Sequence, residues 1–252
     1  MLSIQNLSCE IGGKSILKNI SFSVNENDFC MLMGPNGAGK TSLIKAIMQD
    51  YAYSGKAILL GKDLKGLTPA QRARLIGVLS QKNNDPQYPY SVLDIVSLGR
   101  YAYKKGIFSR LSNGDKEEIE KAMELTKITH LKNRSILTLS GGELQRVMLA
   151  KLFAQNPKLL ILDEPLNHLD FNHQIKIFDI LKNWSKEKGH SILAVAHDFN
   201  FAKAYATHAL LLKEGQIFAQ GKTADVLNSE NLSYVFQADI SGWIKKQLVL
   251  WA

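Results

Sequence analysis

The sequence predicts an α/β fold built around a mixed sheet, and three observations carry that prediction. Two short apolar runs, "KLLILDE" at 158–164 and "HSILAVAH" at 190–197, have the length and texture of strands that are buried on both faces. Between them, residues 171–187 place apolar side chains at helical spacing, so the order is strand, helix, strand. A glycine-rich loop at 34–41 likewise lies between an apolar strand and a helix.

Shorter strands precede this region. Apolar residues alternate or cluster in five segments that we predict as strands: Ile4–Leu7, Ile16–Val24, Phe29–Met33, Ile58–Leu60 and Ile76–Leu79. Alternation is clearest at Ile20, Phe22 and Val24, which is typical of an antiparallel strand beside a buried parallel sheet. "TPAQ" at 68–71 has the form of a capping box with proline at the first helical position, and predicts a helix start.

A change of texture near residue 82 indicates a helical insertion. A polar, proline-bearing stretch, "KNNDPQYPYS", leads into a helix near 91–99, a charged helix opening at 115–118, and a helix after Gly142. We therefore predict a single domain over 1–252. Its core comprises approximately 1–81 and 156–252, and a helical subdomain occupies approximately 82–155.

The bulk composition is that of an ordinary globular protein, with 45% hydrophobic and 21% charged residues. No apolar run approaches the roughly 20 residues that span a bilayer, and the N-terminus has no signal-peptide pattern. Cys9 and Cys30 form no CxxC pair, so two free thiols are expected. The net charge is +8, but the lysines are scattered and accompany no recognition module, so no nucleic-acid partner is expected.

The segment "GPNGAGKTS" at 34–42 matches the phosphate-loop pattern and predicts a P-loop NTPase core. Glycines let successive backbone N–H groups face phosphate oxygens, Lys40 reaches the β- and γ-phosphates, and the Thr41 hydroxyl binds Mg²⁺. A glycine-rich turn with a chance lysine is the alternative, which the flanking strand and helix disfavour. The predicted nucleotide-binding residues are Asn36, Gly37, Ala38, Gly39, Lys40, Thr41 and Ser42.

Two adjacent carboxylates end the predicted strand in "LLILDEP". Asp163 is placed to hold Mg²⁺, and Glu164 to orient or deprotonate the attacking water. An acidic turn after a strand is the plainer interpretation, and the phosphate loop elsewhere in the chain favours catalysis over it.

"LSGGELQR" at 139–146 raises a separate question, because it predicts a second anion site. Ser140, Gly141 and Gly142 precede a helix, where exposed N–H groups and a hydroxyl attract negative charge. A chain that already has a phosphate loop has no evident need of another.

Taken in order, these motifs resemble the ATP-binding subunit of ABC (ATP-binding cassette) transporters across nearly the whole chain. The motifs are the loop at 34–41, Gln81 in "VLSQ", "LSGGE" at 139–143, "ILDEP" at 161–165, "NHLD" at 167–170 and His197 in "AVAHD". A closer similarity is to the ATPases of importers for iron–siderophore, haem or cobalamin. It rests on "SVLDIVSLGR" at 91–100, "LNHLDFNHQ" at 166–174 and "NLSYVFQADI" at 231–240.

The resemblance implies roles for individual residues. Gln81 is expected to touch Mg²⁺ and to relay the nucleotide state to a membrane partner through the helical insertion. Ser140, Gly141 and Gly142 are expected to bind the ATP held by the phosphate loop of a second subunit, which would explain two anion sites in one chain. Asp170 is expected to lie across the dimer interface, and His197 to contact the γ-phosphate. A histidine that merely caps a strand is the alternative for His197.

The function implied is that of an ATP-hydrolysing importer subunit. Two copies would enclose two ATP molecules with Mg²⁺ and drive integral membrane permease subunits, with a substrate-binding protein as an indirect partner. The chain is then expected at the cytoplasmic face of the cell membrane, as a peripheral subunit. A soluble ABC ATPase not coupled to transport, for example in iron–sulphur cluster assembly, is the alternative.

Two positions depart from the pattern of the family. Ile11 stands near the place where an aromatic residue usually stacks on adenine, so base stacking is expected to be weaker or supplied elsewhere. Leu166 stands where threonine or serine is usual after the "DEP" proline.

Overall fold

The computed structural model describes residues 1–80, 88–104, 106, 110–164 and 170–250. The chain forms two compact units. The first contains Met1–Gly66 and Ser191–Ala252, and the second contains Leu67–His190.

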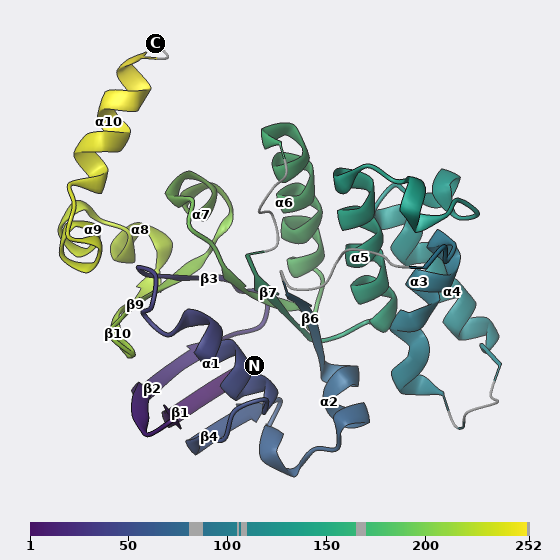
Figure 1. The fold of residues 1–252 in the computed structure, drawn as a ribbon, viewed down its shortest axis with the longest axis horizontal. Coiled ribbons are helices and arrows are strands. Elements are labelled where there is room, and N and C mark those ends of the chain that lie inside the picture. The colour runs from purple at the N-terminus through teal and green to yellow at the C-terminus, as the bar shows by residue number, and fades with distance from the viewer. Residues whose placement is uncertain (81–87, 105, 107–109, 165–169, 251–252) are drawn as a thin grey trace. The chain divides into compact units, whose positions relative to one another are not determined.

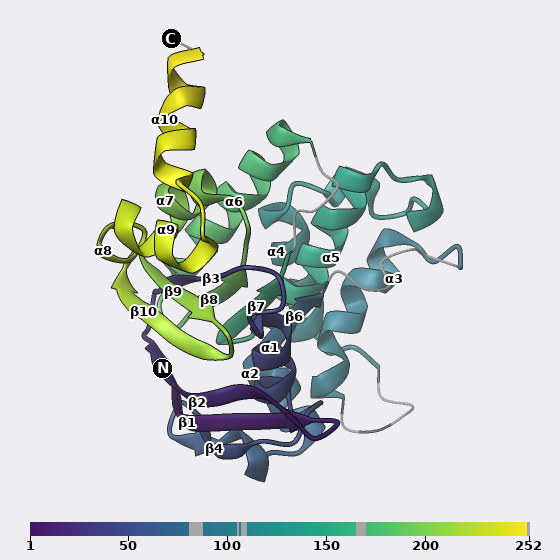
Figure 2. The ribbon, with the colours of Figure 1, turned by 60° about the vertical axis from the view of Figure 1, so that its left-hand side comes forward.

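An antiparallel sheet of four strands opens the first unit (Figure 2). The strands follow the order β2-β1-β4-β5, with bounds β1 Leu2–Ile11, β2 Lys14–Val24, β4 Ser54–Leu59 and β5 Lys62–Asp63. Ile20, Phe22 and Val24 on β2 are all buried, which confirms the predicted antiparallel alternation. β1 is interrupted by shifts of register, and Asn6 within it has a left-handed φ of 51°.

The same unit also contains parallel strands. β3 (Phe29–Met33) pairs in parallel with β8 (Ser191–Val195) on one side and with β9 (His208–Lys213) on the other. β10 (Gln216–Lys222) closes this group as an antiparallel neighbour of β9. Every residue of β3 and β8 is buried, as their apolar runs predict. The helices of the unit are α1 (Lys40–Met48), η1 (Leu64–Gly66), α7 (Phe199–Tyr205), α8 (Thr223–Val226), α9 (Ser229–Phe236) and α10 (Ile240–Leu250).

The second unit combines a pair of parallel strands with most of the longer helices. β6 (Ile76–Ser80) pairs with β7 (Leu159–Asp163). Within this unit α5 lies beside α3 and α4 (Figure 1). The helices are α2 (Pro69–Leu75), α3 (Val92–Ser97), η2 (Leu98–Tyr103), α4 (Asn113–Leu125), η3 (Thr129–Leu131), η4 (Ile136–Thr138), α5 (Gly141–Gln155) and α6 (Phe171–Ser185).

Capping boxes set where several of these helices begin. At α2 the Thr68 hydroxyl accepts from the Gln71 N–H at 3.3 Å, and the Gln71 side chain accepts from the Thr68 N–H at 2.9 Å. The box predicted at 68–71 is therefore confirmed. The helix expected near 91–99 is shorter, because α3 ends at Ser97 and the chain continues as the 3₁₀ helix η2.

A buried arginine joins three helices of the second unit. The Arg100 guanidinium on η2 donates to the Asp115 carboxylate at 2.8 Å and to the Ala154 carbonyl at the end of α5, also at 2.8 Å. Tyr103 lies under the guanidinium, with its ring centre 3.8 Å from Cζ. Among the helices of the described residues, none is long and apolar enough to cross a membrane.

Candidate functional site

The phosphate loop leaves the end of β3 and enters α1, as predicted. Gly34, Gly37 and Gly39 all have positive φ, at 155°, 79° and 106°. A Cβ on Gly34 would stand 2.1 Å from the Leu212 carbonyl oxygen, so β9 approaches the loop too closely for any side chain there. The backbone curve that phosphate binding requires is thus enforced by both conformation and packing.

The turn between β9 and β10 is hydrogen-bonded to the phosphate loop. The N–H of Gly215, between β9 and β10, donates to the Ala38 carbonyl at 3.0 Å. The Gly215 carbonyl in turn accepts from the Lys18 N–H of β2 at 2.8 Å. These bonds tie the loop to two other strands of its unit, which makes it a rigid cradle.

Lys40 is buried, with 7% of its surface exposed. Its ammonium donates to the Gly34 carbonyl at 2.7 Å and to the Pro35 carbonyl at 3.0 Å, which places the charge inside the curve of the loop. Gly39 precedes α1 without a side-chain cap, so backbone N–H groups at the helix start point toward the same place. Asn36 and Thr41 are exposed, Ser42 is partly exposed and Ala38 is buried.

His197 lies at the same edge of the parallel strands as the phosphate loop. β3 and β8 run in parallel, with Leu32 opposite Val195, and both His197 and the loop follow these strand ends. Its side chain is exposed, and Asp198 caps α7 directly after it. Ligands of open α/β sheets bind at the carboxyl ends of parallel strands, where these two features meet.

The acidic pair belongs to the second unit. Asp163 ends β7, in register with Ser80 at the end of β6, and both Asp163 and Glu164 are half-buried. Glu164 has a φ of 51°, a conformation that costs a residue with a side chain about 1–2 kcal/mol. Strain of this kind accumulates at functional positions, where the surrounding structure imposes it.

Ser140 begins α5 as its N-cap. The Ser140 N–H and hydroxyl both donate to the Glu143 carboxylate, at 2.8 and 2.9 Å, and the Glu143 N–H donates to the Ser140 hydroxyl at 3.3 Å. The Ser140 N–H and then its hydroxyl hold the pKa of Glu143 below its usual value. Glu143, which motif matching left without a role, therefore orients the Ser140 hydroxyl.

Asp170 caps α6, and its partner is a histidine that sequence reasoning missed. The Asp170 carboxylate accepts from the His173 N–H at 2.8 Å, and the His173 Nδ1 lies 2.8 Å from the other carboxylate oxygen. The backbone N–H of His173, followed by its ring, lowers the pKa of Asp170. The His173 ring also packs against Gly142, so Asp170 and the start of α5 are brought together. The signal was present as Asp and His three residues apart across a helix start.

Several residues singled out in the sequence fall outside the described part of the chain. Gln81, Leu166 and the stretch 167–169 lie in parts of the chain that the structure does not describe.

Ile11 ends β1 with 36% of its surface exposed, so it is available to a ligand. Both cysteines are buried free thiols, and burial raises the pKa of Cys30 above its usual range.

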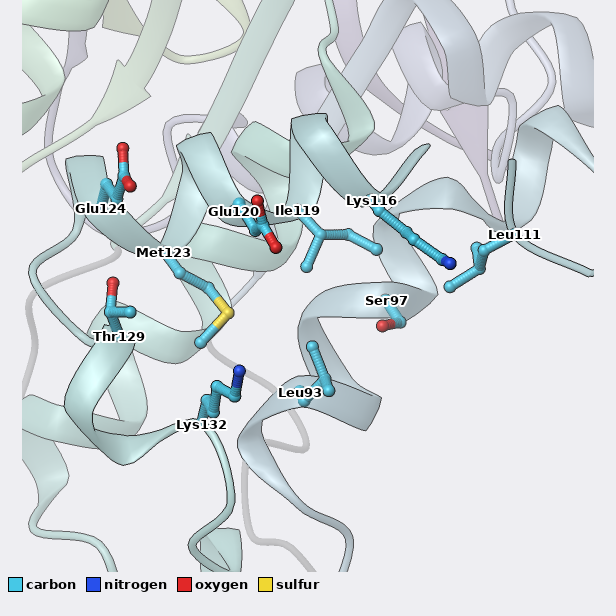
Figure 3. Close-up of a pocket in the computed structure, with 10 residues that line it drawn as sticks. All are labelled: Leu93, Ser97, Leu111, Lys116, Ile119, Glu120, Met123, Glu124, Thr129 and Lys132. Carbon is cyan, nitrogen blue, oxygen red and sulfur yellow. The ribbon is translucent and has the colours of Figure 1, made fainter. Parts of the chain in front are cut away.

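A separate cavity of about 340 Å³ opens within the second unit. Ile119 and Met123 from α4 face Leu93 from α3, and Lys132 closes one side (Figure 3). Its walls combine apolar groups with two lysines and two glutamates, and it has no glycine-rich loop among the described residues that line it. Its chemistry suits an apolar side chain better than a nucleotide phosphate.

Comparisons with known proteins agree with this geometry. A family described as "ABC transporter" matches residues 17–167. The ferric enterobactin transport ATP-binding protein FepC of Escherichia coli (strain K12) is 34% identical over 92% of this chain and 85% of its own length. The hemin import ATP-binding protein HmuV of Rhizobium johnstonii is 34% identical over 94% of this chain and 90% of its own. The ADP conformation of MJ1267, an ATP-binding cassette of an ABC transporter, superimposes with a TM-score of 0.83 at 25% identity, covering 94% of this chain and 98% of that one.

Proposed function

We propose that this chain, which belongs to the ABC transporter family as one of its ATP-binding ATPase subunits, drives uptake of an iron–siderophore, haem or cobalamin substrate through a membrane permease. The relatives named for ferric enterobactin and hemin share about a third of their residues with it over most of both chains. The cobalamin alternative rests on the sequence motifs alone.

The buried ammonium of Lys40 within the phosphate loop is the observation that best supports ATP binding and hydrolysis. Residues 36–42 supply backbone N–H groups and hydroxyls, and Lys40 can exchange its two carbonyl acceptors for phosphate oxygens. His197, at the same sheet edge, is our candidate for the contact to the γ-phosphate. It would stabilise the charge that develops there as the terminal P–O bond breaks.

Glu164 is our candidate for the general base. It would accept a proton from the water whose oxygen bonds to the γ-phosphorus while ADP departs. Thr41, Gln81 and Asp163 would hold Mg²⁺, and a hydroxyl, an amide and a carboxylate form the oxygen donor set that this ion prefers. Held by these residues, Mg²⁺ would supply positive charge that offsets the negative charge of the phosphates.

Ser140, Gly141, Gly142 and Asp170 would act on the nucleotide of a second copy. The start of α5 offers N–H groups and an oriented hydroxyl, and the nearby Arg134 guanidinium lies 4.0 Å from the Glu143 carboxylate, so the loop suits a phosphate already held by a lysine from elsewhere. The working unit is then a dimer with two composite sites, and each chain contributes half of both.

We propose that the permease contact lies on the helical subdomain, approximately 82–155, which is distinct from the core at approximately 1–81 and 156–252. Large apolar side chains are exposed on this stretch at Leu98 and Tyr101, with 55% and 68% of their surfaces accessible. The chain would then be peripheral at the cytoplasmic face of the membrane, and a substrate-binding protein would act through the permease.

Substitution Glu164→Gln tests the assignment. The amide keeps size and hydrogen bonding but cannot take the proton, so ATP binding should persist while turnover falls by about 10²-fold or more. An ATP-dependent shift from monomer to dimer in size-exclusion chromatography should accompany the loss. Lys40→Ala is the matched control, since it should lose both nucleotide binding and the shift. Hydrolysis at the wild-type rate by the Glu164→Gln variant would show that Glu164 is not the general base.

A further inference from the structure

His173 contacts two positions that are separated along the chain, Asp170 at the start of α6 and Gly142 at the start of α5. Its Nδ1 lies 2.8 and 2.9 Å from the two oxygens of Asp170, which fixes the plane of the ring. The side chain is one-third exposed, so the ring is held by these contacts rather than by deep burial. One end of the ring is thereby tied to the N-cap residue of α6.

The other end of the ring rests on the start of α5. A Cβ built on Gly142 would stand 2.4 Å from His173 Cδ2 and 2.7 Å from Nε2, so a side chain there would force the ring to shift. Gly142 is buried at this point, whereas Gly141 beside it has open space. The position of the His173 ring therefore requires that residue 142 has no side chain.

We propose that His173 is a positioning residue, which sets the spacing between Asp170 and the Ser140–Gly142 loop so that both can engage the nucleotide of a partner subunit together. This rests on the proposed function, which assigns both loops to the opposing nucleotide. A ring bonded at one end and packed at the other acts as a spacer of fixed length, whereas two unconnected loops would each have to be ordered on closure.

The first test is His173→Ala. Two quantities are compared in this variant, the affinity of the monomer for ATP and the ATP concentration that half-saturates turnover. The Kd of the monomer for ATP reports the phosphate loop alone and should stay within about twofold. The ATP concentration that half-saturates turnover should rise about tenfold or more, because misplacing a catalytic constellation by about 1 Å costs up to 10²-fold. His173→Asn, whose amide N can stand where Nδ1 stood, should recover part of the loss. Unchanged turnover kinetics in His173→Ala would overturn the proposal.

A double-mutant cycle tests the packing contact separately. Gly142→Ala should strongly lower turnover through the clash with the ring, and Gly142→Ala combined with His173→Ala should be more active than the Gly142 variant alone. Strictly additive losses would show that the ring does not bear on Gly142. This comparison remains informative even if His173→Ala by itself is poorly folded, because relief of a clash raises the recovered activity.

Ser140→Arg separates failure of this proposal from failure of the proposed function. If Ser140→Arg hydrolyses ATP normally, the loop has no nucleotide role and both proposals fall. If Ser140→Arg is inactive while His173→Ala matches the wild type, only the role of His173 is wrong.

Discussion

At Gly34, one absent Cβ decides whether the phosphate loop can form. A Cβ there would overlap the Leu212 carbonyl oxygen at 2.1 Å, and a backbone carbonyl of β9 cannot rotate away as a side chain could. Gly37 differs, because it has a φ of 79° but a Cβ there would meet no described atom within 4 Å.

We expect Gly34→Ala to lower the free energy of unfolding by about 3 kcal/mol, through overlap and the shifts that it forces. Gly37→Ala should cost only the conformational strain of a left-handed residue, about 1 kcal/mol. Urea unfolding monitored by circular dichroism measures both. Equal losses in the two variants would contradict the packing explanation.

At the scale of elements, a capping carboxylate couples α4 to its neighbours. Asp115 accepts from the Ser112 hydroxyl that begins α4 and from buried Arg100, which also bonds the end of α5. The Ser112 hydroxyl first, and Arg100 after it, lower the pKa of Asp115 to about 2. Because the folded pKa lies below the unfolded one, the stabilisation is complete above about pH 4 and fades as the pH falls toward 2.

Asp115→Asn should therefore reduce the stability near pH 6 by about 2 kcal/mol. The difference from the wild type should shrink by about half at pH 3, where the carboxylate is protonating in the unfolded state. Urea unfolding at pH 6, 4 and 3 gives the comparison. A difference that stays constant over this range would mean that the charge of Asp115 is not what stabilises α4.

Elements that are determined by residues close together in the sequence could be predicted, whereas elements held by distant contacts could not. β3 and the box at Thr68 were placed correctly, because apolar runs and capping hydroxyls act within a few residues. β9 and β10 received no sequence prediction; their pairing with strands distant in the chain fixes them. The packing of His173 against Gly142 was missed for the same reason, since a histidine on a helix gives no sign of which distant residue packs against it.

At the scale of the whole molecule, the composite-site proposal predicts complementation between two inactive variants. Lys40→Ala disables the phosphate loop, and Ser140→Arg disables the loop at the start of α5. In a mixed dimer one site carries both defects, and the other combines an intact Lys40 from one subunit with an intact Ser140 from its partner.

Each variant alone should therefore trap almost no nucleotide, whereas an equimolar mixture should trap up to about one ATP per mixed dimer. Adding Glu164→Gln to both chains stops turnover, so that trapped radiolabelled ATP can be counted after rapid gel filtration. The Lys40→Ala chain alone, at the same total protein concentration, is the control. If the mixture traps no more than the mean of its components, each ATP is bound by a single chain, and the loop at 139–146 needs another role.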